Sequence, residues 1–505
     1  MGNFTNLIAG FHTALSISNI GAAALGAVLG IIVGAMPGVG SLVGVALLLP
    51  LTYHFNPTTA IIMLGAIYYA NMFGGAFSAI LINVPGDAPA IMTSMDGYPL
   101  ARKGKPGKAL MTANVSSFFG GLIGMVILTF MGPTLARAGL KFGPAEMTML
   151  MLVALSSISW LIEGNVFKGL AVTCIGILIS TIGISTNTAH ARYTFGSVQL
   201  LSGINFIPLV VGFIGMAQVF NLVGQAEREN DMVVKRLGLA DCKLSKEDIS
   251  RISGPIARGG LLGSVIGFIP GAGATMAAIV SYTIQKKNKN NKEKLGTGAI
   301  EGIAASESAN NGAAAGAFGP LLALGIPGSG TTAVLLGGLM MWGLEPGPRL
   351  FTDHADFAWG LISSLFISNL IALAIALVMI PMIMKVICIP NKILIPSIVV
   401  ICFVGAYAST NSMWGVLVMI VGGILGYLFQ RFGYSASPML LASILAVTFE
   451  VNLRRALTIS GGSPAIFVTK PLALIFFLIF VVLLCSPMIK KAYRKNHAPK
   501  AESEA

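Results

Sequence analysis

The sequence is short of charged residues. Of its 505 residues only 10% are Asp, Glu, Lys or Arg, whereas 55% are hydrophobic, and the mean hydropathy is +0.83. Soluble domains carry roughly a quarter charged residues, so this composition excludes an ordinary soluble protein. Uncharged apolar stretches such as residues 111–131 and 357–384 reach the roughly 20 residues that a helix needs to cross a bilayer. The composition predicts an all-α polytopic membrane protein.

Cysteine and histidine are also scarce, with five residues of each. The cysteines lack the spacing of a disulfide framework or a metal site, and the histidines are far apart along the chain. The stretch from Gly325 to Thr332 resembles a phosphate loop, but Thr331 stands where such a loop needs lysine. We therefore expect that the protein is not an enzyme, and that it binds no cofactor and no metal ion other than a coupling Na⁺.

Basic residues exceed acidic ones, which gives a formal net charge of +13. In a soluble protein this excess would suggest nucleic acid, but here it sits mainly in short loops and in the C-terminal tail. Basic residues in short loops orient membrane proteins with those loops in the cytoplasm. The charge therefore predicts orientation in a lipid bilayer, and we expect no nucleic acid partner.

Glycine and proline are abundant, and two Gly/Pro signatures each occur twice in the same order. The first signature is Pro37, Gly38 and Gly40, repeated as Pro270, Gly271 and Gly273; the second is Pro85, Gly86 and Asp87, repeated as Pro327, Gly328 and Ser329. Pro37 to Pro270 is a shift of 233 residues, and Pro85 to Pro327 is a shift of 242. The chain therefore contains an internal duplication of a hydrophobic unit that is broken twice.

Such breaks carry a physical cost in lipid. They free backbone N–H and C=O groups, which are tolerated only inside protein or beside a water-filled cavity. Paired breaks at corresponding positions of two halves indicate the binding site of a secondary transporter. We therefore predict that all residues of the four signatures form a substrate site, on broken helices or re-entrant hairpins. The alternative is that Gly and Pro serve close helix packing.

The basic loop changes ends between the two copies. In the first copy it follows the second signature, at residues 102–108; in the second copy it precedes that signature, at residues 286–294. Positive-inside bias produces this switch when one copy is inserted upside down. The sequence therefore predicts an inverted-topology repeat.

These features divide the chain into four parts. The first membrane half covers residues 1–224, with repeat 1 at about 20–110, and a charged cytoplasmic connector covers residues 225–258. The second membrane half covers residues 259–489, with repeat 2 at about 259–355, and residues 490–505 form a basic cytoplasmic tail. Within the connector, Ser245 followed by Glu247 and Asp248 predicts the start of a helix.

Few polar side chains that could bind a cation lie inside the apolar stretches. Glu307 is an ionisable residue in such a stretch, and Asn71, Asn310 and Asn311 carry amide oxygens in Gly/Ala-rich sequence. Carboxylate and amide oxygens suit a Na⁺ site, so we predict that these four residues bind the coupling cation. The alternatives are that Glu307 and Asp87 cap helices or pair with a loop lysine, and that the asparagines bridge packed helices.

Several motifs in order resemble the large permease subunit of tripartite tricarboxylate transporters. The resemblance covers nearly the whole chain and is carried by residues 37–40, 68–75, 83–87, 96–101, 307–311 and 325–329. Asp87 stands where that family is expected to have Glu, so the carboxylate is kept with a shorter reach.

The resemblance implies a permease of the bacterial inner membrane that takes up a small di- or tricarboxylate. It also implies a small membrane subunit, a periplasmic solute-binding protein that delivers the substrate, and a driving gradient of Na⁺ or H⁺. The residues by themselves support a secondary transporter with alternating access. A channel or a structural subunit of a membrane complex is the alternative function, and a homodimer is left open.

Overall fold

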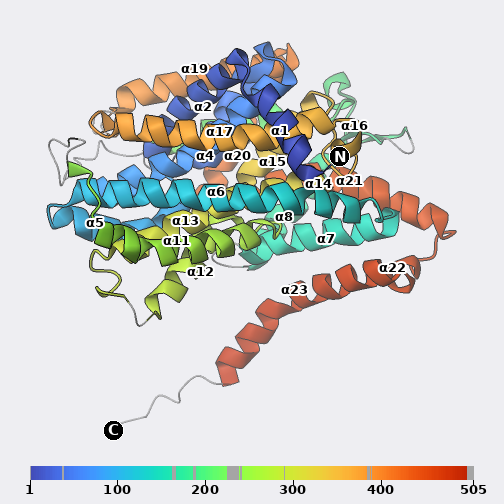
Figure 1. Cartoon of the computed structure of the whole chain (residues 1–505). Coiled ribbons are helices and arrows are strands. Elements are labelled where there is room, and N and C mark those ends of the chain that lie inside the picture. The colour runs from blue at the N-terminus through green and yellow to red at the C-terminus, as the bar shows by residue number, and fades with distance from the viewer. Residues whose placement is uncertain are drawn as a thin grey trace, which may run out of the picture.

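The computed structural model of the chain describes residues 2–36, 39–161, 166–185, 189–223, 238, 241–288, 291–383, 387 and 389–496. It is built almost entirely of helices, and most of them run along one common direction, which is horizontal in Figure 1. Seven of the described helices are long and apolar enough to cross a membrane. The predicted all-α polytopic membrane fold is confirmed.

Repeat 1 folds as a broken hairpin followed by a long buried helix. Its elements are α2 (Ile17–Ala35), α3 (Gly40–Leu48), the 3₁₀ helix η1 (Leu49–His54), α4 (Pro57–Ile82), the 3₁₀ turn η2 (Ala88–Ala90) and α5 (Ile91–Arg102), and α1 (Asn3–Ala14) precedes them. Helix α3 turns back along α2, since a Cβ on Gly44 would lie 2.8 Å from Val33 Cγ1. The structure therefore shows a broken helical hairpin at the first signature.

Repeat 2 also has a broken hairpin, then long buried helices and a second break. Its elements are α11 (Lys246–Gly267), α12 (Gly273–Lys286), α13 (Ile300–Gly316), α14 (Phe318–Leu324) and α15 (Gly330–Met341). Helix α12 turns back along α11, where Arg258 Nη2 donates to Gln285 Oε1 at 2.8 Å. The predicted start of α11 is confirmed, because Ser245 and Asp248 form a capping box there.

The hairpins pack on the long helices through glycines in one register. In repeat 1, a Cβ on three glycines of α2 would lie 2.3 to 2.6 Å from carbonyl oxygens of α4; these pairs are Gly26–Met63, Gly30–Ile67 and Gly34–Asn71. In repeat 2 the corresponding distances are 2.1 to 2.8 Å, for the pairs Gly259–Ala305, Gly263–Ala309 and Gly267–Ala313. Residues of the two hairpins that are 233 positions apart, and residues of the two long helices that are 242 positions apart, thus make equivalent contacts in the two repeats.

The two repeats run in opposite directions. Within repeat 1, α5 runs parallel to α4, because Gly75 lies beside Asp87 and Gly97 lies beside Ile80. Against repeat 2, α5 runs antiparallel to α13, because Gly302 lies beside Asp96 whereas the earlier Gly298 lies beside Leu100. Helix α4 therefore opposes α13, and the inverted-topology repeat is observed in the structure.

The remaining helices interlock the two halves. The first half adds α6 (Pro106–Gly139), α7 (Pro144–Leu161), α8 (Val166–Ser180), a short antiparallel pair β1 (Gly183–Ile184) and β2 (Ala191–Arg192), the 3₁₀ turn η3 (Val198–Leu200), α9 (Phe206–Val210), the π-helical η4 (Val211–Met216) and α10 (Ala217–Val223). The second half adds α16 (Leu350–Asp353), α17 (Ala355–Met379), α19 (Asn391–Thr410), α20 (Met413–Arg431), α21 (Ser437–Ile459), α22 (Ile466–Thr469) and α23 (Pro471–Asn496).

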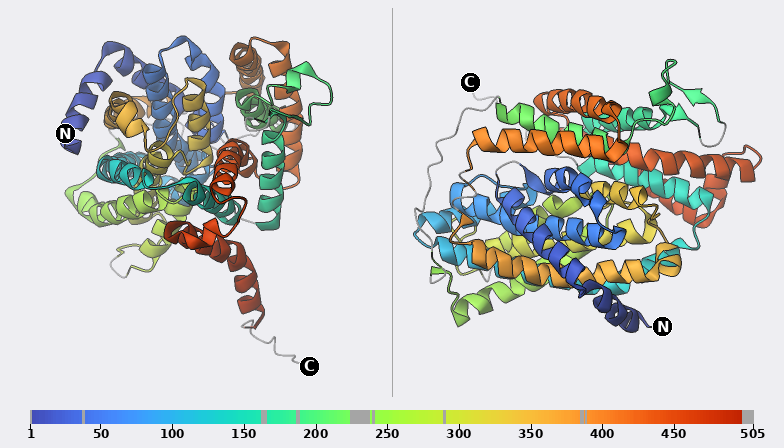
Figure 2. Two further views of the ribbon diagram at one scale, coloured as in Figure 1. Left: turned by 90° about the vertical axis from the view of Figure 1, so that its right-hand side faces the viewer. Right: turned by 90° about the horizontal axis from the view of Figure 1, so that it is seen from above.

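Each half lends helices to the other. Helix α6 packs on α13 and α17 packs on α4, while α8 packs on α21 and α20 packs on η4. The left view of Figure 2 looks along the helices and shows the repeats grouped on one side, with α19, α20 and the β1–β2 hairpin on the other. The pseudo-symmetry thus extends beyond residues 20–110 and 259–355, which the motifs alone identify.

Both basic loops lie at the same end of the molecule, which we call the basic end. Gly298, which follows the basic loop of repeat 2, lies beside Leu100, which precedes the basic loop of repeat 1. Lys108 of the first loop also pairs with Asp248, at the start of α11, at 2.6 Å. Residues 497–505 of the predicted tail and residues 225–237, 239 and 240 of the predicted connector lie outside the described residues. The switch of the basic loop between the two repeats is therefore what brings both loops to one end, as positive-inside bias requires.

Candidate functional site: the four Pro-Gly breaks

The two breaks of repeat 1 meet midway along α4. The amide of Gly40 donates to the Gly86 carbonyl at 3.0 Å, and the amide of Ser41 donates to Asp87 Oδ2 at 2.9 Å. Pro37 and Gly38, the other residues of this break, lie outside the described residues. The second signature therefore satisfies backbone donors that the first break leaves free at the start of α3.

Asp87 acts here as a double cap. Besides accepting from Ser41, its other oxygen Oδ1 accepts from the amide of Ala88 at 2.8 Å, at the start of η2. A carboxylate at a helix N-terminus is stabilised by the free N–H groups and the helix dipole. The negative charge that the start of α3 favours is thus supplied by the chain itself.

The breaks of repeat 2 meet in the same way but without a carboxylate. A Cβ on Gly328 would lie 2.9 Å from the Gly267 carbonyl oxygen, just as one on Gly86 would lie 1.7 Å from the Gly34 oxygen. Gly271 and Gly273 both have positive φ, at 78° and 65°, and Ala272, which precedes α12, makes no side-chain cap. The N-terminus of α12 therefore keeps a positive potential that Asp87 cancels at α3.

The repeats touch each other at the breaks. Ser41 Oγ and Thr331 Oγ1 are 3.0 Å apart, and Tyr68 OH and Ser329 Oγ are 3.4 Å apart. Ser329 also caps α15 by accepting from the amide of Thr332 at 3.2 Å. Hydroxyl groups from α3, α4 and α15 thus converge between the two halves, at the place where an inverted-repeat transporter binds its substrate.

Glu307 lies in a polar cluster formed by α5, α6 and α13. It is completely buried, and it accepts from Ser117 Oγ at 2.8 Å, from Asn310 Nδ2 at 3.1 Å and from the hydroxyl of Thr93. Asn311 Nδ2 donates to the Asn310 oxygen and, at 3.1 Å, to the Glu307 carbonyl. No cationic side chain among the described residues pairs with this carboxylate, although a buried membrane charge is expensive.

Asn71 is separate from that cluster. It is completely buried on α4 beside Gly34, and neither its oxygen nor its nitrogen has a hydrogen-bond partner among the described residues. Asn311 Oδ1 lacks one as well. Buried amides are nearly always hydrogen-bonded, so these atoms are suited to a ligand. The position of Asn71 in repeat 2 is taken by Ala313, so this feature is not duplicated.

Asp96 is an important residue that the sequence analysis did not assign. It is completely buried, and its Oδ1 accepts from the amides of Gly296, Gly298 and Ala299 at 2.8 to 2.9 Å. Its Oδ2 accepts from Tyr282 OH at 2.8 Å. Asp96 thereby fastens α5 of repeat 1 to the α12–α13 loop of repeat 2 at the basic end.

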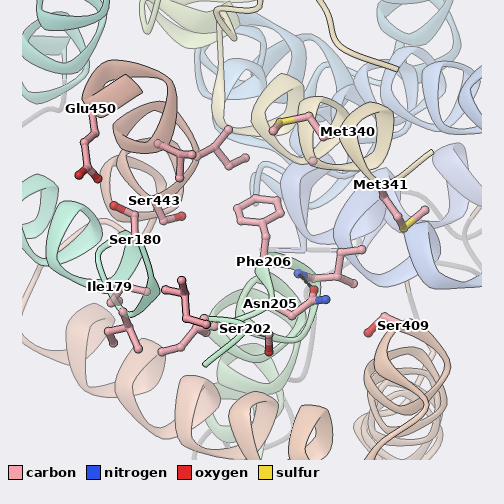
Figure 3. A pocket seen from close by; sticks show the side chains of 18 of the residues that line it. Ile179, Ser180, Ser202, Asn205, Phe206, Met340, Met341, Ser409, Ser443 and Glu450 are labelled. Carbon is pink, nitrogen blue, oxygen red and sulfur yellow. Dashed lines mark hydrogen bonds between the residues drawn. The ribbon is translucent and has the colours of Figure 1, made fainter. Parts of the chain in front are cut away.

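One cavity lies away from the breaks. It has a volume of about 590 Å³ and is lined by α15, α21, the segment around residues 179–207 and two residues of η1 and α19, and Figure 3 shows it from close by. None of the predicted site residues lines it. We call it the outer cavity, because it lies at the end of the molecule opposite the basic end.

The structure thus brings together most of the predicted site residues and adds others. Thr93, Ser117, Ser41 and Thr331 were missed because hydroxyls on apolar helices carry no pattern that shows which neighbour they face. The signal for Asp96 was present, since it is an acid followed by Gly97 and Pro99 inside a recognised motif. The roles in substrate and cation binding stay predictions.

Comparison with known proteins agrees with the motif resemblance. The tripartite tricarboxylate transporter TctA family matches residues 20–441. An Agrobacterium vitis protein described as an uncharacterized 52.8 kDa protein in the TAR-I ttuC' 3'region is 42% identical over 475 residues, which are 94% of each chain.

A second Agrobacterium vitis protein, described as an uncharacterized protein in the TAR-II ttuC' 3'region, is 39% identical over 231 residues. These residues are 45% of this chain and 96% of that protein. No solved structure matches.

Proposed function

Because the chain belongs to the tripartite tricarboxylate transporter TctA family, we propose that it carries out ion-gradient-driven uptake of a small di- or tricarboxylate. It acts in the bacterial inner membrane, beside a small membrane subunit and a periplasmic binding protein that delivers the substrate. The observation that carries this proposal is the junction of two oppositely oriented repeats through Ser41–Thr331 and Tyr68–Ser329, where the first break of repeat 1 meets the second break of repeat 2. Such junctions bind substrate in inverted-repeat transporters.

The substrate carboxylates bind mainly in repeat 2. At α3 the free N–H groups already hold Asp87, whereas at α12 the corresponding place has Gly271 and Gly273 and no capping side chain. Each free helix N-terminus is equivalent to about half a positive charge. An anion at the junction is therefore attracted toward α12 and repelled by Asp87.

The coupling cation binds at the buried oxygens. Glu307 needs either a proton or a cation to offset its charge, and the Asn311 oxygen beside it is unpartnered among the described residues. Asn71 offers a second place, next to the first break of repeat 1. A cation bound near the junction also compensates the charge of the substrate, which couples the two binding events.

Transport against a gradient tests this function. The chain would be reconstituted with its small subunit in proteoliposomes, with the binding protein outside, and the accumulation of a labelled di- or tricarboxylate would be followed. The expected result is accumulation above the outside concentration that collapses when ionophores abolish the Na⁺ and H⁺ gradients. A channel would only equilibrate the solute, and a structural subunit would show no uptake in the absence of another permease.

A further inference from the structure

Two arginines meet one glutamate at the outer cavity, which Arg192 and Glu450 line. Arg192 on β2 donates from Nη1 to Glu450 Oε1 at 2.7 Å, and Arg454 donates from Nε to the same oxygen at 3.0 Å. Two guanidinium groups therefore share one carboxylate. Arg192 Nε is buried without a hydrogen-bond partner among the described residues. Arg192, Arg454 and Glu450 together carry one net positive charge, which a carboxylate in the cavity balances.

The size and lining of the cavity suit a small polar anion. Its volume of about 590 Å³ is within the range of ligand sites, and apolar side chains such as Phe206 and Met340 form part of its wall. Figure 3 labels six polar residues of the wall, which are Ser180, Ser202, Asn205, Ser409, Ser443 and Glu450, and Tyr53 and Arg192 line the cavity as well. Ser180 and Ser443 each donate to a carbonyl one turn back in their own helix, a bond that a rotating hydroxyl exchanges readily for a ligand.

The cavity is connected to the breaks by one helix. Helix α15 contributes Gly337, Met340 and Met341 to the wall, and its other end starts beside Ser329. At about 1.5 Å per residue, these three residues place the wall of the cavity roughly 12–18 Å from that break. A solute in the outer cavity thus lies near the junction but outside it.

We propose that the outer cavity binds a carboxylate group of the solute through Arg192, and so holds the solute on the side opposite the basic end before it reaches the breaks. The inference rests on the proposed transport function for the identity of the solute. It adds a cationic side chain to a pathway whose predicted central site uses helix N-termini and cations.

Labelling of Ser443→Cys tests the proposal. The five native cysteines are first replaced by alanine, and the new thiol is labelled with a membrane-impermeant maleimide in vesicles. Citrate and succinate should slow the labelling, and glucose at the same concentration should not. With Arg192→Gln, the concentration of citrate that gives half protection should rise at least tenfold. Arg192→Lys should fall between the two, because it keeps the charge but loses the forked geometry.

Lys168→Gln is the matched control. Lys168 is at the far end of α8 from Ser180, where its ammonium donates to the Phe432 carbonyl at 2.7 Å. The substitution therefore removes one positive charge, as Arg192→Gln does, but at a position away from the outer cavity. If Arg192→Gln does not fold, the double variant Arg192→Gln, Glu450→Gln removes the pair without leaving an unpaired acid. Absence of protection by citrate would overturn the proposal, and so would equal protection by glucose or an unchanged half-protection in the Arg192 variants.

The labelling result is independent of uptake. Protection by carboxylates in a chain that fails to accumulate them would keep the cavity as an anion site and reject the transport function. Accumulation without any protection at Ser443→Cys would keep the transport function and reject the cavity.

Discussion

The carbonyl oxygen of Gly34 lies against Gly86 so closely that a Cβ on Gly86 would be 1.7 Å away from it. The corresponding pair in repeat 2 is Gly267 and Gly328, where the distance would be 2.9 Å. Both contacts are between backbone atoms, so no side-chain rotation can relieve an added methyl group. Each repeat thus joins its two breaks through a glycine that leaves no room for a side chain.

Gly86→Ala and Gly328→Ala should therefore abolish most uptake while the chain still inserts. The expected cost of the overlap is about 1–3 kcal/mol, larger for Gly86, and it falls on the geometry of the break. Gly21→Ala in α2 is the control, since a Cβ there meets nothing within 4 Å. Uptake and detergent-solubilised yield would be measured for all three variants. Normal uptake in the Gly86 variant would show that the break is not at the transport site.

The opposite orientation of the repeats predicts a labelling pattern. His54, in the turn before α4, and Lys294, in the loop before α13, occupy corresponding positions and are both exposed. In a background without native cysteines, His54→Cys should react with an impermeant maleimide from the outside of intact cells. Lys294→Cys should react only after the membrane is permeabilised. Reaction of both from the same side would contradict the inverted insertion.

Asp96→Ala should destabilise the protein more than the loss of any one of its partners. The substitution leaves three backbone amides and the Tyr282 hydroxyl without their acceptor. Hydrogen bonds to a charged group contribute about 1.5–3 kcal/mol each, so a loss of several kcal/mol is expected. Tyr282→Phe removes only one bond and is the matched comparison. Thermal unfolding in detergent measures the stability of both variants. Equal melting temperatures would argue against the role of Asp96 in fastening α5 to the α12–α13 loop.

The Lys108–Asp248 pair should make stability depend on pH at the basic end. Burial opposes the charge, but hydrogen bonds from Lys108 and Ser245 lower the pKa of Asp248 below its ordinary value. A lowered pKa contributes stability above the unfolded value of about 4, and this contribution is lost as the pH falls through the folded pKa. Asp248→Asn should therefore unfold at a lower temperature than wild type at pH 7. The difference in melting temperature between the two proteins should shrink below pH 4. A difference that does not change with pH would mean that the capping box alone, and not the charge of Asp248, causes it.

The sequence predicted the breaks, their pairing and the inversion, because each leaves a local mark in residue type. Proline at 85 and 327, glycine beside it and the switched basic loops are visible without knowledge of distant contacts. The start of α11 was equally local, since Ser245 and Asp248 are three residues apart and cap each other.

The partners of Glu307 could not be predicted. Thr93 and Ser117 come from α5 and α6, and their sequence positions say nothing about which face of α13 they meet. The interlocking of α6 with α13 and of α17 with α4 was also invisible, because helices that are apolar on all sides carry no periodic pattern that selects a neighbour. The outer cavity could not be predicted either, because Arg192 and Glu450 are far apart in sequence and nothing in the sequence indicates that they pair.

The last prediction concerns the coupling ion. If the cation at Glu307 compensates the substrate charge, then substrate and cation binding strengthen each other by the same factor in both directions. Asn310→Ala removes a donor to the Glu307 carboxylate, and Asn311→Ala removes an oxygen that has no partner among the described residues. Both variants should raise the cation concentration that gives half-maximal uptake, with a smaller loss at saturating cation.

A Na⁺ series at fixed pH and a pH series at fixed Na⁺ separate the two candidate ions. Asn114→Ala is a suitable control, because Asn114 on α6 is also buried with an unpartnered amide among the described residues but makes no bond to Glu307. For a Na⁺ site, the shift caused by Asn311→Ala should appear in the Na⁺ series and exceed that of the control. For a proton site on Glu307, Asn310→Ala should move the pH series instead. If both asparagine variants keep the wild-type dependence on both ions, these residues serve packing and the cation binds elsewhere, for which Asn71 is the next candidate.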